Sequence, residues 1–234
     1  IPRPWVRDPD FHALEEAIPE AGGYSFPSGH SQTAVGYLGC VAATQKHKLI
    51  RAVCIAFMIL VPFSRMYVGV HTPADVLVGS AMALIMVFAF KPLMLGNGKK
   101  NIPIVFAVLL SLSIANLLFV ELYPFPADVD DHNYNSALKN AYTFLGCFLG
   151  ILIVYFVDEK KLNFHTEAVW WAQILKALGG LAVVLAVKSG MKPVLELIMP
   201  EMPARAVRYC MIVVVAGIVW PLTFKWFAKL GRKE

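Results

Sequence analysis

Long apolar runs alternate with short polar or charged segments along the whole chain. A membrane-spanning helix needs about 20 mostly apolar residues, because each residue adds about 1.5 Å along the helix axis. Seven runs come close to this length, at residues 29–45, 49–65, 74–94, 102–123, 136–157, 168–188 and 206–228. The first two are the shortest and contain polar residues. The pattern predicts an all-α, polytopic transmembrane helical bundle.

The composition agrees with this interpretation. Of 234 residues, 58% are hydrophobic and 16% are charged, whereas soluble domains are about 25% charged. The net charge of +5 comes from basic residues at the ends of the apolar runs, where they orient a membrane protein. They do not form the basic face with interleaved aromatic residues that binds nucleic acid. We therefore expect membrane lipids, and no nucleic acid, as partners.

Basic residues mark alternate loops between the predicted spans, and the positive-inside rule places such loops in the cytoplasm. They are Lys46, Lys48 and Arg51; Lys91, Lys99 and Lys100; Lys160 and Lys161; and Lys225, Lys229, Arg232 and Lys233. The segment 124–135, on the other side, has three aspartates and no lysine or arginine. The predicted loop 188–205 breaks the pattern, because it too is basic. Residues 1–28 and 65–75 are then predicted to lie together on the outer face.

A cluster of reactive side chains follows the second predicted span. Thr72 before Pro73 is a typical helix start, with a hydroxyl at the cap and a proline in the first helical position. Asp75 would lie in the first turn, where its carboxylate can accept a hydrogen bond from one nitrogen of His71. The other nitrogen is then free to act as a nucleophile. Arg65 adds a planar, permanently charged fork suited to phosphoryl oxygens.

A second cluster, residues 26–30, precedes the first predicted span. Ser28 can cap the helix, and Gly29 lets the backbone approach an anion closely. The free N–H groups of a helix start make a natural seat for phosphate. His30 would then be placed to donate a proton to a leaving oxygen. Arg3 supplies a further charged fork for the transition state.

Each cluster also has a purely structural interpretation. Pro-Ser-Gly-His is a common helix start, and histidine and aspartate four residues apart form ordinary local pairs. Ionisable groups beside apolar spans are costly, however, and are usually functional. Because both clusters are predicted on one membrane face, a single helix hairpin apart, we expect them to form one site. No group of residues near them has the spacing of metal ligands, so a reaction without metal is predicted.

These motifs resemble those of the type 2 phosphatidic acid phosphatases, a family that shares its fold with the vanadium haloperoxidases. The family pattern is Lys-x6-Arg-Pro, then Pro-Ser-Gly-His, then Ser-Arg-x5-His-x3-Asp. Arg3-Pro4 matches the end of the first part, and residues 27–30 match the second part without a change. The third part is matched by Ser64, Arg65, His71 and Asp75. The resemblance covers about residues 1–90.

The resemblance implies a role for each matched residue. His71 would be the nucleophile, His30 the general acid, and Asp75 the partner of His71. The residues that would hold the phosphate are Arg3, Ser28, Gly29 and Arg65. No metal or other cofactor is implied for a phosphatase, although the vanadium enzymes use the same pocket for vanadate.

The resemblance also bears on the organisation of the chain. The lysine of the first motif would lie seven residues before Arg3, upstream of Ile1, and family members have further membrane helices there. We therefore expect this chain to be part of a longer protein. Residues 1–95 are predicted to form the catalytic membrane core. Residues 96–234 would add transmembrane helices to the same membrane domain, in a role that the sequence does not indicate.

The favoured function is that of a lipid phosphatase acting through a phosphohistidine intermediate. Its substrate would be a lipid phosphate or diphosphate, such as phosphatidate, phosphatidylglycerophosphate or a polyprenyl diphosphate. The active site is predicted on the extracytoplasmic face of the plasma membrane. One alternative is a lipid phosphotransferase that uses the same site, and another is a non-catalytic membrane transporter or scaffold. The intact motifs favour an enzyme.

Overall fold

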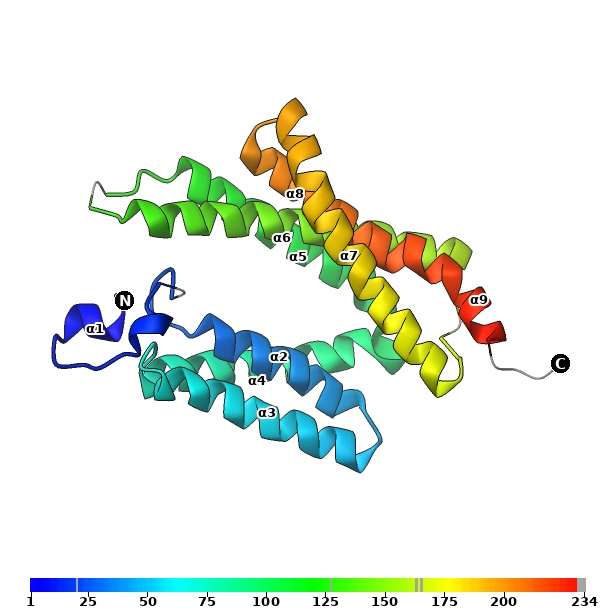
Figure 1. Cartoon of the computed structure of the whole chain (residues 1–234), viewed down its shortest axis with the longest axis horizontal. Helices are drawn as coiled ribbons and strands as arrows, with labels where there is room; N and C mark the ends of the chain where they lie inside the picture. Colours follow the sequence, from blue (N-terminus) through cyan, green and yellow to red (C-terminus); the bar gives the residue numbers. More distant parts are fainter. Residues whose placement is uncertain (20, 127, 163, 165, 231–234) are drawn as a thin grey trace. The chain divides into compact units, whose positions relative to one another are not determined.

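The computed structural model describes residues 1–19, 21–126, 128–162, 164 and 166–230, and over these residues the chain forms helices, turns and loops without a strand (Figure 1). The α-helices are α1 (Pro4–Arg7), α2 (Gly29–Thr44), α3 (Lys48–Tyr67), α4 (Pro73–Met94), α5 (Ile102–Leu122), α6 (Asp131–Val157), α7 (Trp170–Ile198), α8 (Glu201–Val214) and α9 (Phe224–Lys229). Short 3₁₀ or π segments are η1 (Glu15–Ala17), η2 (Gly96–Asn101), η3 (Asp158–Leu162), η4 (Val215–Val219) and η5 (Trp220–Thr223). The predicted all-α fold is confirmed. Arg232 and Lys233, used above to orient the chain, lie outside the described residues.

Within the described residues, 6 helical segments are long and apolar enough to cross a membrane. They are α3, α4, α5, α6, α7 and the continuous stretch Glu201–Lys229. Large apolar side chains such as Leu77, Ile85 and Phe88 stay exposed along these helices, which is the expected state of a surface that faces lipid. Six of the seven predicted spans therefore correspond to spanning helices, and the protein is a multi-pass membrane protein.

The remaining predicted span corresponds to α2, which has 16 residues and a length of about 24 Å. It nevertheless runs parallel to α4 over most of that length. A Cβ on Gly36 would lie 3.7 Å from Cβ of Ala83. Further along, Nζ of Lys91 donates a hydrogen bond of 3.0 Å to the carbonyl oxygen of Ala43. Since Lys91 stands near the end of a spanning helix, α2 covers most of the same distance.

One predicted boundary is wrong. The sequence predicts a loop over 188–205 because that segment is basic, but α7 continues to Ile198 and α8 begins at Glu201. Lys188 and Lys192 are therefore helical. Lysine is a good helix former, so its appearance ends an apolar run without ending the helix. Hydropathy located the end of the apolar run, and the hydrogen-bonded backbone continues about three turns beyond it.

The chain divides into two compact units. Unit 1 contains Ile1–Val105 and Asp130–Ser136, and unit 2 contains Phe106–Val129 and Ala137–Glu234. Compactness does not say which helices catalysis requires. The division into a catalytic part at 1–95 and added helices at 96–234 therefore stays a prediction.

In unit 1, the turn between α3 and α4 is built to receive the N-terminal segment. Gly69 adopts φ 75°, a left-handed conformation that glycine adopts readily. A Cβ there would lie only 2.5 Å from the carbonyl oxygen of His12, so no larger residue fits. The amide of Leu14 donates to the carbonyl oxygen of Val68 at 3.1 Å. These contacts hold the N-terminal segment against the turn that carries His71.

In unit 2, helices approach each other closely at glycines. A Cβ on Gly146 of α6 would lie 2.1 Å from the carbonyl oxygen of Ala206 in α8. A Cβ on Gly179 of α7 would lie 2.7 Å from Cη2 of Trp220. Small residues that let backbones approach are the usual means of packing helices in lipid, where no hydrophobic force draws them together. Glycines therefore let the helices of unit 2 pack closely.

Candidate active site

The two sequence motifs meet at the end of unit 1 where α2 and α4 begin. The amide of Ser28 donates a hydrogen bond of 3.0 Å to the carbonyl oxygen of Asp75. Ser25, just before the first motif, donates from its hydroxyl to the carboxylate of Asp75. The structure thus places the start of α2 directly against the start of α4. Every residue of the predicted site belongs to unit 1.

His71 and Asp75 form the buried centre of this cluster, and each is only 3% exposed. Nδ1 of His71 lies 3.6 Å from Oδ2 of Asp75. That distance permits an electrostatic attraction but is too long for the predicted hydrogen bond. The reason is visible at Oδ2, which already accepts from the hydroxyl of Ser25 and, at 2.8 Å, from the amide of Thr72.

The same carboxylate also caps α4. The Thr72 hydroxyl accepts from the amide of Asp75 at 3.3 Å, while the Asp75 side chain accepts from the amide of Thr72. This reciprocal pair is a capping box, and Pro73 occupies the first turn as predicted. Asp75 therefore has two tasks, since it fixes the helix start and faces the imidazole of His71.

Arg3 closes the other side of the histidine. Its Nη1 donates to the carbonyl oxygen of Val70 at 3.0 Å and lies 3.1 Å from Nε2 of His71. Its Nε and Nη2 donate to the carbonyl oxygens of Gly23, at 3.0 Å, and Gly22, at 2.6 Å. Because a guanidinium only donates, Nε2 must accept, and the proton of the neutral ring is on Nδ1, facing Asp75. The nitrogen that carries the lone pair is therefore Nε2.

The surroundings keep His71 neutral. Burial lowers the pKa of His71 below its usual value, and the positive charge of Arg3 lowers it further, whereas the carboxylate of Asp75 opposes both effects. Burial also lowers the pKa of Arg3, but a guanidinium starts so high that it stays charged. The site therefore combines a neutral imidazole with a permanent positive charge beside it, which suits nucleophilic attack on an anion.

The start of α2 offers backbone N–H groups that can bind an anion. The side chain of Ser28 cannot contribute to such a site, because it is buried. Ser28 is 0% exposed, its amide is bonded to Asp75, and its Oγ accepts from the amide of Ser31 at 3.4 Å. Ser28 is thus a helix cap, as predicted. Among the described residues, the amides of Gly29 and His30 have no recorded acceptor. A Cβ on Gly29 would meet nothing within 4 Å, so an anion can approach there.

His30 and Arg65 complete the predicted set. His30 is exposed in the first turn of α2 and lies close enough to Arg65 and Arg3 to experience both charges. Arg65 is half-buried near the end of α3, where its Nε donates to Oγ of Ser64 at 3.3 Å. The other donors of this guanidinium have no recorded protein acceptor among the described residues, and they are thus available to a bound oxyanion.

Sequence reasoning missed several residues that shape the site. Ser25 lies two residues before Pro27, yet nothing in the local sequence indicates that its hydroxyl reaches Asp75. The carbonyl groups of Gly22 and Gly23 are invisible in any side-chain pattern, although a Gly-Gly pair signals a tight turn. His132 is also nearby, because its Nε2 would lie 3.0 Å from a Cβ on Gly22. Within the described residues, no group of three metal-ligating side chains is assembled.

Comparisons with known proteins indicate the family of the chain. The family model of the PAP2 superfamily matches residues 1–99, and that of the PAP2 superfamily phosphatase, transmembrane extension, matches residues 142–233. Undecaprenyl-diphosphatase BcrC of Bacillus subtilis (strain 168) is 36% identical over 89 residues, which are 38% of this chain and 43% of that protein. The match thus spans less than half of the relative. No solved structure matches the chain.

The two family models match separate parts of the chain, residues 1–99 and residues 142–233. The first covers the whole His71, Asp75, Arg3 and His30 constellation, and the second covers most of unit 2. Together with the motifs and the multi-pass helical fold, these matches show that the chain belongs to the PAP2 superfamily.

Proposed function

We propose that this protein is a phosphatase that hydrolyses a lipid phosphate or diphosphate through a phosphohistidine on His71. The observation that carries the proposal is the arrangement around one imidazole. His71 has Arg3 at 3.1 Å from Nε2 and Asp75 at 3.6 Å from Nδ1. A carboxylate on one nitrogen and a cation on the other suit a histidine that must attack a phosphoryl group and then carry it.

The chemistry would follow in two steps. Nε2 of His71 attacks the phosphorus atom, a P–N bond forms, and the P–O bond to the leaving group breaks. His30 donates a proton to the departing oxygen. In the second step a water attacks the phosphorus while His30 takes up its proton, and the P–N bond breaks to release phosphate and restore His71.

The remaining residues would hold the phosphoryl oxygens. Arg65 and the amides of Gly29 and His30 offer donors that the described residues leave unused. The hydrogen bond from Arg3 to Nε2 of His71 must break when the phosphoryl group binds. Nη1 of Arg3 can then donate to a phosphoryl oxygen from nearly the same position. Ser28 would act by fixing the start of α2, because its own side chain is buried. Positive charge from the two arginines stabilises the spreading negative charge of the transition state.

The setting of the site and the relative support the proposed substrate class. The site lies at the ends of spanning helices, so a substrate anchored in lipid can present its phosphate there. BcrC is named for an undecaprenyl diphosphate, and we extend this class to the present chain. Among the three candidate substrates, a polyprenyl diphosphate is therefore favoured over phosphatidate and phosphatidylglycerophosphate.

Phosphate release by the purified chain tests this proposal. The panel contains the three lipid classes, in detergent, and a soluble aryl phosphate, each with and without excess chelator. We expect the polyprenyl diphosphate to be hydrolysed fastest, and its hydrolysis to continue in excess chelator. Vanadate should inhibit the reaction, because it mimics the phosphoryl group. Failure to hydrolyse any lipid would contradict the proposal and favour a non-catalytic protein. Loss of activity in chelator, restored by magnesium, would contradict the metal-free mechanism.

We also propose that the active site faces the extracytoplasmic side of the plasma membrane. The support is the basic turn between α2 and α3, at the other end of these helices from the site. A cysteine-free variant carrying Tyr24→Cys tests this in intact cells, because Tyr24 is 50% exposed near the site. A membrane-impermeant thiol reagent should label it, while Lys48→Cys stays protected. The reverse labelling would invert the topology.

The organisation of the chain completes the proposal. Residues 1–95 would supply the catalytic core, and 96–234 would add transmembrane helices to it. The separate family models for the two regions support this division. The segment Asp130–Ser136 belongs to unit 1 and includes the first turn of α6, so the added region would also contribute the start of this helix close to the site.

A further inference from the structure

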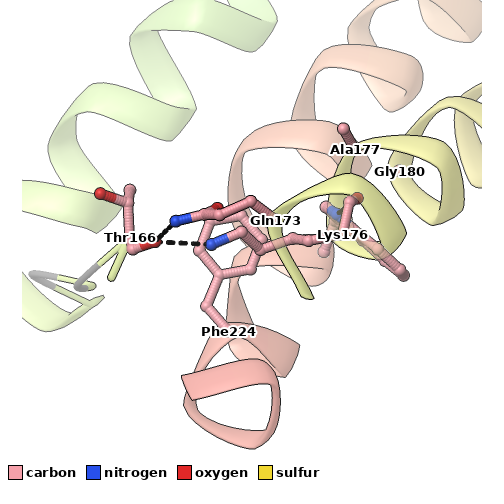
Figure 2. A pocket seen from close by; sticks show the side chains of 7 residues that line it. Thr166, Gln173, Lys176, Ala177, Gly180 and Phe224 are labelled. Carbon is pink, nitrogen blue, oxygen red and sulfur yellow. Dashed lines mark hydrogen bonds between the residues drawn. The ribbon is translucent and has the colours of Figure 1, made fainter. Parts of the chain in front are cut away.

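A mostly apolar pocket that contains a few polar groups lies in unit 2, between the first turns of α7 and the segment that leads into α9. Figure 2 shows this pocket, which has a volume of about 370 Å³. Small-molecule sites typically have about 300–1,000 Å³. The pocket is open on one side, and its lining residues are Thr166, Gln173, Lys176, Ala177, Gly180, Trp220 and Phe224. Neither the sequence motifs nor the proposed reaction uses any of them.

A buried ammonium group dominates the pocket. Lys176 is only 7% exposed, and its Nζ donates to the carbonyl oxygen of Thr166 at 2.7 Å and lies 4.4 Å from the ring centre of Phe224. Within the described part of the chain, no carboxylate lies within ion-pair distance of it. A buried charge without a counter-charge is costly. The pocket therefore favours an anion from outside the chain.

Two sets of donors converge on this space. Nε2 of Gln173 donates to the same Thr166 carbonyl oxygen, also at 2.7 Å (Figure 2). An ammonium has three N–H groups and an amide has two, so each side chain keeps at least one donor beyond the shared carbonyl. These donors suit the oxygens of a phosphate group, and the aromatic wall of Trp220 and Phe224 suits hydrocarbon beside it.

The position along the helix matches a lipid head group. Lys176 lies six residues after Trp170, the first residue of α7, which is about 9 Å along the axis. Trp170 is exposed, as aromatic residues at a membrane interface usually are. Lys225 and Lys229, on the same short helix as Phe224, are exposed as well. The end of unit 2 that holds the pocket is therefore basic and at interfacial depth.

We propose that this pocket binds the phosphodiester head group of an anionic phospholipid, with Lys176 and Gln173 as its donors. The lipid would come from the leaflet at the N-terminal end of α7, which the positive-inside rule makes the cytoplasmic leaflet. Because the readouts below are lipid retention and thermal stability, they do not depend on the proposed phosphatase reaction.

The test uses the purified full chain and native mass spectrometry. The protein is offered equal amounts of phosphatidylglycerol and phosphatidylcholine, and the retained lipids are counted. We expect selective retention of phosphatidylglycerol, and a loss of that preference by about fivefold in Lys176→Gln, the effect of one lysine charge near an anionic lipid. Lys188→Gln is the matched control, since Lys188 is exposed on the same helix outside the pocket. It should retain the preference.

A second variant protects the test against misfolding. Ala177→Phe leaves Lys176 charged but fills the open wall of the pocket, and Ala177 is exposed, so the fold should tolerate it. It should lose the preference for phosphatidylglycerol as well. Thermal unfolding adds a third measurement, in which phosphatidylglycerol raises the Tm of the native chain and of Lys188→Gln but not of Lys176→Gln.

Three outcomes would overturn the proposal. One is equal retention of both lipids by the native chain. Another is an unchanged preference in both Lys176→Gln and Ala177→Phe, which would assign the selectivity to other basic residues. The last is stabilisation by inorganic phosphate alone, equal to that by phosphatidylglycerol and lost in Lys176→Gln, which would identify a soluble anion as the ligand.

Discussion

Each of the two units holds a cation near the start of a helix, half-buried in unit 1 and buried in unit 2, and the two cations are held in different ways. In unit 1, Arg3 donates to three carbonyl oxygens and to the imidazole of His71, beside the carboxylate of Asp75. In unit 2, Lys176 has one carbonyl oxygen and one aromatic ring, and within the described residues no titratable side chain pairs with it. The first cation belongs to a connected network, whereas the second stands almost alone.

This difference separates chemistry from recognition. Acid–base and nucleophilic chemistry uses groups that influence one another's protonation states, and His71, Asp75 and Arg3 lie close enough to do so. A single ammonium in a pocket can attract and orient an anion but has no partner with which to transfer a proton. Arginine fits the first task because its planar fork fixes several acceptors at once, and lysine fits the second as a compact charge. The following predictions test that separation.

Loss of His71 should have the largest effect. His71→Ala removes the proposed nucleophile and should reduce kcat by at least about a thousandfold, since the residues of a covalent mechanism act as a unit. Phosphate release and trapping of a labelled phosphoenzyme are the measurements. His12→Ala is the control, because His12 is exposed in the nearby N-terminal segment. Substantial turnover by His71→Ala would remove this residue from the reaction.

Replacement of the arginine fork should come next. Arg3→Lys keeps the charge but cannot reproduce donation to Gly22, Gly23, Val70 and His71 together. We expect a loss in kcat/KM of about a hundredfold, comparable to removing one donor that stabilises a transition state. Arg7→Lys, at an exposed position in α1, should be close to the native chain. Full activity of Arg3→Lys would show that the site needs only a positive charge at this position. Arg3 and Lys176 would then not differ in the way proposed above.

The hydroxyl of Ser25 should have a smaller effect, because it acts through Asp75. Ser25→Ala removes one hydrogen bond to a carboxylate, and such bonds contribute about 1.5–3 kcal/mol. We expect kcat to fall by about tenfold with KM nearly unchanged, and Ser25→Thr to recover most of the activity by restoring the hydroxyl. A rise in KM alone would show that Ser25 binds substrate and does not position Asp75.

The pH profile tests the electrostatic coupling of Arg3 to His71. Because burial and Arg3 lower the pKa of His71, the neutral imidazole persists to a lower pH than for an ordinary histidine, whose pKa is about 6.5. The acid limb of kcat/KM should therefore lie below that value. Arg3→Gln removes a positive charge, so the pKa of His71 rises and the limb should move to higher pH. Arg3→Lys should leave it nearly in place. A limb that moves to lower pH in Arg3→Gln would contradict the coupling.

A pair of glycines compares the packing of the two units. At Gly79 a Cβ would lie 2.7 Å from the carbonyl oxygen of Ser28, whereas at Gly190 it would meet nothing within 4 Å. Gly79→Ala should lower the free energy of unfolding by about 1–3 kcal/mol, as overpacking does, and should displace the start of α2. Gly190→Ala should raise it by up to about 1 kcal/mol through helix propensity. Thermal unfolding measures both. A neutral Gly79→Ala would show that the two helices can separate without harm.

The sequence alone predicted the spanning helices and the side chains that form the candidate site. Apolar runs of this length have few stable forms other than helices in a membrane, because every backbone polar group must be satisfied internally. The starts of α2 and α4 could also be predicted from the sequence. Ser28 and Thr72-Pro73 favour a helix start through contacts with residues only a few positions away. The predicted loop over 188–205 is wrong because charged residues indicate where the apolar run ends. They do not indicate where the backbone leaves the helix.

Only the tertiary structure decided how these residues meet. No local rule could bring the hydroxyl of Ser25 to Asp75, 50 positions away, or select the carbonyl oxygens that hold Arg3. Once Oδ2 of Asp75 accepts from Ser25 and Thr72, its predicted hydrogen bond to His71 gives way to a longer electrostatic contact. The Lys176 pocket likewise depends on packing between segments distant in sequence. Contacts of this kind are set by the approach of whole helices, which a linear pattern of side chains does not encode.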